Sequence, residues 1–154
     1  MCPVADRKSD LSLICRVRKR LCALPLEHVI ETLRPLPIEP VAGAPSIVLG
    51  LAVIRGIPLP VVDAGRLFGE EESQPERFVN LVVGARRIAL AVDSVLGVRA
   101  VMQDSLHALP PLLREADDGV VTAIGLLDAE LLLVLRTARL LPEESGLMAT
   151  ETAR

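Results

Sequence analysis

Residues 48–63 read Val48-Leu-Gly-Leu-Ala-Val-Ile-Arg-Gly-Ile-Pro-Leu-Pro-Val-Val-Asp63, and only Arg55 and Asp63 among them are charged. Two apolar runs separated by Arg55-Gly56 predict a strand, a tight turn and a returning strand, with Gly56 supplying a positive φ. We expect these strands at residues 47–54 and 57–62. One cation at the tip of an otherwise apolar hairpin makes Arg55 a candidate contact residue.

The rest of the chain also reads as short strands joined by turns. Pro58 and Pro60 lack backbone N–H groups at alternate positions, which places the returning strand at a sheet edge or a bulge. A short helix or an irregular strand is expected at residues 26–33, and a short turn at 64–68 and a short helix at 137–141. The remaining apolar runs predict strands at 11–17, 21–24, 78–83, 88–92, 95–102, 120–127 and 131–135.

Composition restricts the possible functions. The chain has 154 residues, is 51% hydrophobic and carries a formal net charge of -3, which does not indicate a polyanionic partner. Phe68 and Phe78 are its only aromatic residues, so base stacking is a poor explanation for it. No secretory signal and no apolar run of about 20 residues is visible, so we expect a cytoplasmic protein. The three cysteines are expected to be free thiols, and Cys15 and Cys22, which could face each other across a hairpin centred on Arg18-Lys19, are expected to be small core or edge residues.

The sequence contains an internal duplication. Residues 50–68 align without gaps with residues 123–141, an offset of 73 that matches Val61 with Val134 and Arg55 with Asp128. Residues 23–29 align with 89–95 at an offset of 66. The repeat predicts two small antiparallel barrels of about five strands each, because closing a sheet removes its exposed edges. Neither half is large enough for a generous core, so we expect the two to pack together.

No catalytic constellation is visible. The two histidines, His28 and His107, lack a neighbouring nucleophile, and Asp63 and Asp93 read as residues that cap strands or form turns. No motif for a metal, nucleotide or other cofactor is present. We therefore expect a binding module rather than an enzyme. An alternative is a nucleic-acid-binding small barrel that uses the basic residues of two turns, which are Arg18, Lys19, Arg20, Arg86 and Arg87.

Three stretches carry a family resemblance. They are P-L-E-H-V-I-E-T-L-R from Pro25, A-P-S-I-V-L-G-L-A-V-I-R-G-I-P-L-P-V-V-D ending at Asp63, and R-F-V-N-L-V-V-G-A-R-R-I-A-L-A-V-D-S-V from Arg77. Together with the last hairpin they resemble the CheW-like chemotaxis coupling proteins over roughly residues 11–141. The resemblance implies an all-β fold of two five-stranded SH3-like barrels. We expect a single CheW-like domain at 11–141, with subdomains at about 11–70 and 76–135 and a C-terminal helix that packs back, between flexible segments at 1–10 and 142–154.

The resemblance also implies a function and a site. CheW-like proteins are non-catalytic adaptors that couple the cytoplasmic tips of chemoreceptors to the regulatory domain of a CheA-type histidine kinase. The family's hairpin arginine falls on Arg55, which is expected to pair with Glu31. The implied partner-binding set is Glu31, Gly50, Val53, Ile54, Arg55, Gly56 and Ile57. The family usually has Asn where Val53 stands, so a diverged chemosensory pathway is an alternative to the main chemotaxis system.

Overall fold

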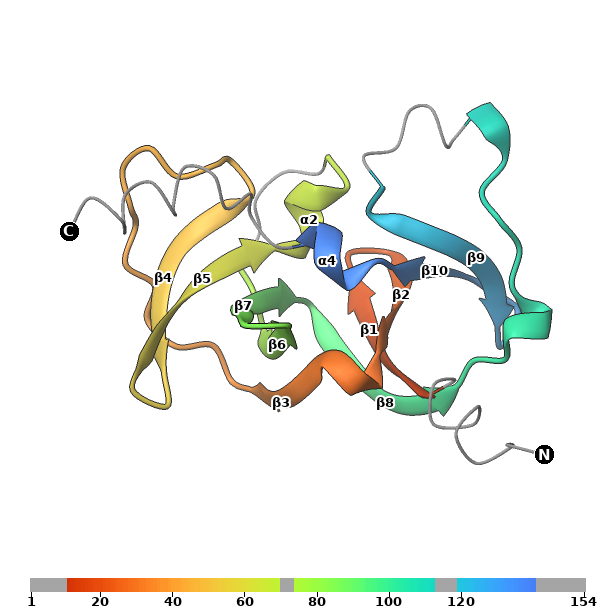
Figure 1. Ribbon diagram of the computed structural model, residues 1–154, viewed down its shortest axis with the longest axis horizontal. Helices are drawn as coiled ribbons and strands as arrows, with labels where there is room; N and C mark the ends of the chain where they lie inside the picture. Colours follow the sequence, from red (N-terminus) through yellow and green to blue (C-terminus); the bar gives the residue numbers. More distant parts are fainter. Residues whose placement is uncertain (1–10, 70–73, 113–118, 141–154) are drawn as a thin grey trace.

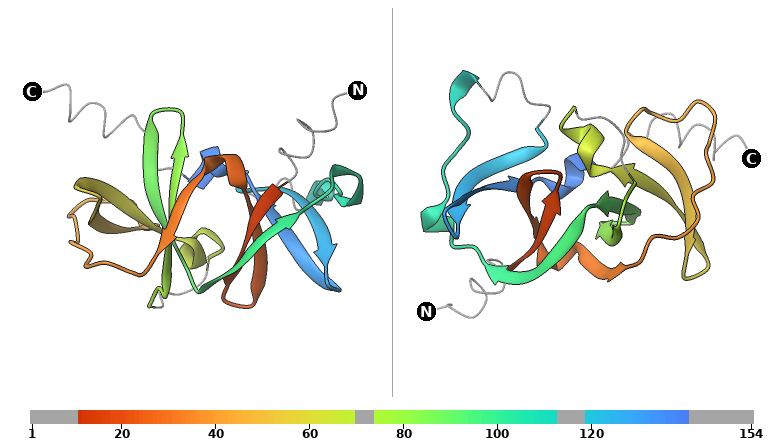
Figure 2. Two further views of the ribbon diagram at one scale, coloured as in Figure 1. Left: turned by 90° about the horizontal axis from the view of Figure 1, so that it is seen from below. Right: turned by 180° about the vertical axis from the view of Figure 1, so that it is seen from behind.

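A computed structural model describes residues 11–69, 74–112 and 119–140, and short strands dominate it (Figure 1). The termini that we expected to be flexible, residues 1–10 and 142–154, lie outside the described residues. The strands form two five-stranded sheets. Each sheet curves into a small barrel, and the two barrels lie side by side, with β4 and β5 at one end of the molecule and β9 and β10 at the other (Figures 1 and 2).

The first barrel contains the hairpin whose turn is Arg55-Gly56. Its strands lie in the spatial order β3 (Val29–Leu33), β6 (Arg77–Val83), β7 (Arg86–Val92), β5 (Ile57–Asp63) and β4 (Val48–Ile54). Neighbouring strands are antiparallel except β5 and β7, which pair in parallel through residues 61–63. Strand β5 is not the edge strand that the prolines predicted, since it lies between β7 and β4. Pro58 and Pro60 precede its parallel segment and are paired on the β4 side alone, so their missing N–H groups interrupt no ladder with β7.

The second barrel repeats this plan. Its strands lie in the order β8 (Ser94–Ala100), β1 (Leu11–Val17), β2 (Arg20–Pro25), β10 (Glu130–Leu135) and β9 (Val121–Leu127). Its single parallel pair joins β2 and β10. Val61 lies opposite Ala89 in the first barrel, and Val134 lies opposite Ala23 in the second. These are the pairs that the offsets of 73 and 66 relate, so the duplication is confirmed.

Short helical segments connect the strands. The 3-10 helix η1 (Leu26–His28) precedes β3, and η2 (Gln103–Ser105) follows β8. Helix α2 (Ala64–Leu67) follows β5, and α4 (Thr137–Leu140) follows β10 at the equivalent place. Asp63 caps α2 by accepting a hydrogen bond from the Gly65 N–H at 3.0 Å.

Three apolar clusters form the core, one inside each barrel and one shared by both, and they explain why the central strands read as nearly continuous apolar runs. In β6, Phe78 packs inside the first barrel, whereas Val79 and Leu81 pack in the cluster shared by both barrels. Because side chains alternate between the two faces of a strand, both faces of these strands are buried. Cys15 and Cys22 are opposite each other in the β1–β2 pair and lie in the shared cluster, where burial raises the pKa of each thiol to about 12.

The two barrels are interleaved in the sequence, unlike the subdomains expected at about 11–70 and 76–135. Strands β1 and β2 belong to the second barrel, together with β8, β9 and β10, while β6 and β7 belong to the first barrel. The expectation of wholly antiparallel barrels was also wrong, since each contains one parallel pair. Among the described residues, no helix has the length and apolar character needed to span a membrane.

Candidate partner-binding site

The β4–β5 turn consists of two residues, Arg55 and Gly56. Both have positive φ, 54° and 79°, which is the geometry of a type I′ turn. A Cβ on Gly56 would meet no atom within 4 Å, so Gly56 is required by its backbone conformation and not by crowding. This turn fixes the direction in which the Arg55 side chain leaves the hairpin.

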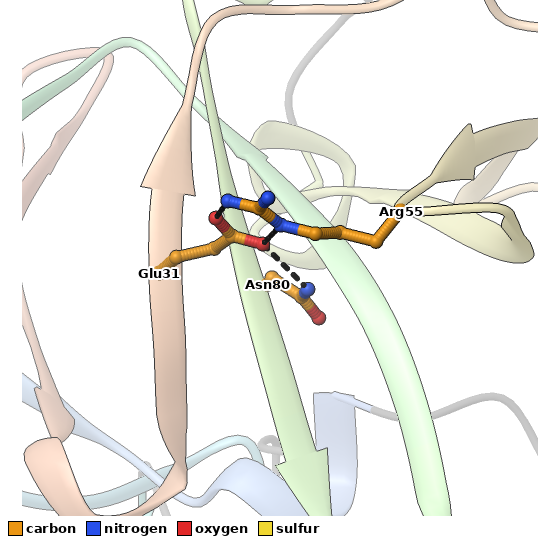
Figure 3. Close-up of polar contacts among 3 residues, drawn as sticks. All are labelled: Glu31, Arg55 and Asn80. Atoms are coloured by element: carbon orange, nitrogen blue, oxygen red, sulfur yellow. Dashed lines mark hydrogen bonds and ion pairs between the residues drawn. The ribbon is translucent and has the colours of Figure 1, made fainter.

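Arg55 reaches from this turn to the strand at the opposite edge of its own sheet. Its Nε and Nη2 donate hydrogen bonds to Glu31 Oε2 and Oε1 of β3, at 3.0 Å and 2.6 Å (Figure 3). Two parallel charge-assisted bonds fix both the position and the plane of a guanidinium. The pair therefore joins the hairpin tip to the far edge of the sheet and helps to close the first barrel.

The two members of this ion pair differ in exposure. The Arg55 side chain is 75% exposed, whereas that of Glu31 is 21% exposed. The hydrogen bonds from Arg55 are the largest cause that holds the pKa of Glu31 below its ordinary value of 4.5, and a hydrogen bond from Asn80 acts in the same direction. Glu31 is therefore ionised at neutral pH and orients an arginine that faces outward.

Asn80 completes the polar cluster, and its role was missed in the sequence. It lies on β6 directly opposite Glu31, and its Nδ2 donates to Glu31 Oε2 at 3.4 Å (Figure 3). The available signal was a single amide inside the apolar run Phe78-Val-Asn-Leu-Val-Val83.

The outer face of the hairpin is apolar. Val53 lies on this face and is 62% exposed, and Ile57, which lies opposite the buried Ile54 at the tip of the hairpin, is 41% exposed, both as expected. Leu51 lies two residues before Val53, shares its face and is exposed too, so it extends the expected set. We call Leu51, Val53, Arg55 and Ile57 the hairpin surface.

Two expected contact residues have other roles. Ile54 is 2% exposed and packs in the core of the first barrel, so the expectation that its side chain offers contact surface is wrong. Gly50 is buried at φ 150°, beside a register shift of the β4–β5 pair. A Cβ at Gly50 would overlap the backbone carbonyl group of Glu39 in the preceding loop. Gly50 therefore permits the close approach of that loop, whose Glu39 exchanges two backbone hydrogen bonds with Leu51.

The basic turns suggested for nucleic acid are partly occupied by protein contacts. The Arg18 N–H donates to Asp93 Oδ2 at 2.9 Å, and its guanidinium lies against Gly65. The Arg20 guanidinium lies 5.0 Å from the centre of the Phe68 ring. These arginines connect the two barrels, which weakens the nucleic-acid alternative.

The described residues provide no group of three or more His, Cys, Asp or Glu side chains that could hold a metal ion. The conspicuous cluster is thus an exposed cation held by a carboxylate beside an apolar face. Such a cluster is suited to binding another protein.

Comparisons with known proteins agree with this geometry. The model of the CheW-like domain family matches residues 12–145. The chain belongs to the CheW-like family. Protein FrzA of Myxococcus xanthus is 33% identical over 148 residues, which cover 88% of this chain and 91% of FrzA. The chemotaxis protein CheW of Rhizobium meliloti (strain 1021) is 25% identical over 111 residues, covering 70% of this chain and 72% of that protein.

A solved structure supports the fold. The crystal structure of the scaffolding protein TtCheW from Thermoanaerobacter tengcongensis superposes with a TM-score of 0.73 at 20% identity, covering 83% of this chain and 89% of that one. The expected two-barrel fold is confirmed by this likeness and by the two five-stranded sheets. Family membership supports a non-catalytic adaptor of chemotaxis signalling and does not favour the nucleic-acid alternative.

Proposed function

We propose that this CheW-like adaptor couples the cytoplasmic tips of methyl-accepting chemoreceptors to the regulatory domain of a CheA-type histidine kinase. The proposal covers both the main chemotaxis system and a diverged chemosensory pathway. The observation that carries it is the hairpin surface, in which a 75% exposed Arg55 is held in one orientation by Glu31. A pre-oriented cation loses little conformational entropy when a partner binds.

The apolar members of the hairpin surface provide the remaining contact area. Leu51 and Val53 are exposed on one face of β4 and can pack against the side of a receptor helix, and Ile57 adds exposed apolar surface at the tip of the hairpin. An apolar patch with a charged residue at its border is a usual composition for a protein interface. Arg55 then supplies orientation and specificity, and the apolar residues supply most of the buried area.

Charge reversal at one residue tests the proposal, with a matched control in the second barrel. Asp128 occupies the position of Arg55 in the β9–β10 turn and also pairs with the opposite edge strand, through Arg99. Arg55→Glu and Asp128→Arg therefore each break one ion pair at equivalent places. Binding is measured by calorimetry with a soluble cytoplasmic fragment of a chemoreceptor from the same organism.

We expect Arg55→Glu to weaken binding of the receptor fragment by about tenfold or more, because a partner carboxylate would then face a carboxylate. Asp128→Arg should bind this fragment like the parent protein. Far-UV circular dichroism and urea unfolding establish that both variants are folded. Equal binding by Arg55→Glu and the parent protein would remove Arg55 from the receptor site.

A further inference from the structure

Asn80 is a buried polar residue in strand β6, whose other buried residues are apolar. It is 3% exposed and lies on the same face of β6 as Phe78, which packs inside the first barrel. A carboxylate only accepts hydrogen bonds, so the amide must present Nδ2 to Glu31. Its Oδ1 is consequently turned away from Glu31 and is buried with no hydrogen-bond donor among the described residues (Figure 3).

An asparagine in this position does not favour folding. A buried acceptor without a donor costs free energy, because it has lost its hydrogen bonds to water. The hydrogen bond that the Asn80 side chain donates to Glu31, at 3.4 Å, is longer than most N–H···O bonds and offsets little of that cost. Residues that violate the rules of stable packing tend to occur where function requires them.

The second barrel provides an internal comparison. Asn80 lies between Glu31 on one neighbouring strand and Ala89 on the other. The equivalent residue, Ile14, lies between Gly97 and Ala23. Ile14 is 1% exposed and packs in the core of the second barrel, so this fold accepts an apolar side chain at that position. The second barrel also has no carboxylate where Glu31 stands, since Gly97 occupies the place.

We propose that Asn80 is a positioning residue for the Glu31–Arg55 pair. By binding Glu31 Oε2, Asn80 holds the carboxylate in the plane that meets Nε and Nη2 of Arg55. The remaining nitrogen of the guanidinium, Nη1, then stays available at the surface for an acceptor on a partner. This last consequence depends on the proposed function, whereas the positioning itself belongs to the isolated protein.

Replacement of Asn80 by the residue of the second barrel tests this role without any partner. Asn80→Ile removes the donor to Glu31, and Asn80→Val does so with a smaller side chain in case isoleucine is too large. Three quantities are measured on the full chain: the pKa of Glu31 by carboxyl ¹³C NMR titration, the exchange rate of the Arg55 Nε–H, and the urea midpoint of unfolding. Leu59→Val, a change in the same apolar cluster at a residue that forms no side-chain hydrogen bond with Glu31, serves as the packing control.

We expect the pKa of Glu31 to rise and the Arg55 Nε–H to exchange faster in both Asn80 variants, while the urea midpoint stays the same or increases. The packing control should leave the pKa of Glu31 and the Arg55 exchange rate unchanged. The inference is overturned if the Asn80 variants keep the parent pKa and exchange rate, whatever their stability. Binding of the receptor fragment to Arg55→Glu is a separate readout, so failure of the proposed function is distinguishable from failure of the role of Asn80.

Discussion

Arg55 and Asp128 occupy the same position in two equivalent turns, with φ of 54° and 51°, and each forms an ion pair with the opposite edge strand of its own barrel. The charges are reversed, because Arg55 pairs with Glu31 and Asp128 pairs with Arg99. Both barrels thus have an ion pair between the hairpin turn and the opposite edge strand, but the positions of the positive and negative charges are exchanged. What distinguishes the two hairpins is the charge that each presents to solvent.

The second turn contains a conformational strain that the first avoids. Ala129 has φ 68° where its counterpart, Gly56, has φ 79°. A left-handed conformation disfavours a residue with a Cβ, so Ala129→Gly should increase the free energy of unfolding by about 0.5–1 kcal/mol. Gly56→Ala should lower it by a similar amount. Urea unfolding measures both changes, and a decrease in stability for Ala129→Gly would contradict the assignment of the turn.

Gly50 and Gly97 both have positive φ, but only Gly50 is crowded by neighbouring atoms. Alanine substitutions at the two positions therefore distinguish the cost of crowding from the cost of backbone strain. Gly50→Ala must move the Glu39 carbonyl group out of the way, whereas a Cβ at Gly97 meets nothing within 4 Å. We expect Gly50→Ala to reduce the free energy of unfolding by more than about 1 kcal/mol and by clearly more than Gly97→Ala. Chemical denaturation of both variants checks this order. Equal losses would mean that the loop near Glu39 moves aside easily.

Truncation of the adjacent β4 residues Val53 and Ile54 should have very different effects on stability. Ile54→Ala removes a core side chain and should cost about 2–5 kcal/mol of stability. Val53→Ala changes a side chain that is 62% exposed and should alter stability by less than about 0.5 kcal/mol. Binding to the receptor fragment should be weakened by Val53→Ala while its unfolding curve stays close to that of the parent protein. The reverse pattern would mean that the face of β4 has been misassigned.

The Glu31–Arg55 pair should make stability depend on pH. The pKa of Glu31 is lowered in the folded protein, chiefly by the hydrogen bonds from Arg55, from an ordinary value of 4.5. The stabilisation is therefore complete above pH 4.5 and is lost as the pH falls through the lower, folded-state pKa. The difference in unfolding free energy between the parent protein and Glu31→Gln should be largest at neutral pH and should shrink on acidification.

Urea unfolding at a series of pH values measures this difference. Glu130 provides a second case, because hydrogen bonds from Arg16 lower its pKa in the same way. A difference that grows as the pH falls would contradict the ion pairing of Glu31.

Much of the fold could be predicted from the local sequence pattern of apolar runs and turn residues. The strands expected at 47–54 and 57–62 differ by one residue at one end from β4 (Val48–Ile54) and β5 (Ile57–Asp63). Gapless alignment of residues 50–68 with 123–141 worked because equivalent strands keep the same register and the same two-residue turn. Interleaving of the barrels could not be predicted, because β1 and β6 have similar apolar patterns and nothing local indicates which sheet each joins.

The site was harder to predict than the fold. Val53 and Ile54 are both β-branched and apolar, so their chemistry alone does not indicate that Ile54 is the one that faces the core. The pairing of Arg55 with Glu31 came from the family resemblance, since 24 residues separate them in the chain. Asn80 was missed because its importance depends on the residue opposite it in the sheet, which the sequence does not state.

Exchange of the two charges, Glu31→Arg with Arg55→Glu, tests the central claim most directly. The double variant rebuilds the ion pair in the polarity of Asp128–Arg99 but presents a carboxylate where the hairpin surface now presents Arg55. We expect its urea midpoint to be closer to that of the parent protein than that of Arg55→Glu alone, because the ion pair is restored. The decisive measurement is the calorimetric affinity of this double variant for the chemoreceptor fragment. The account predicts a loss of about tenfold or more, and an affinity equal to that of the parent protein would contradict it.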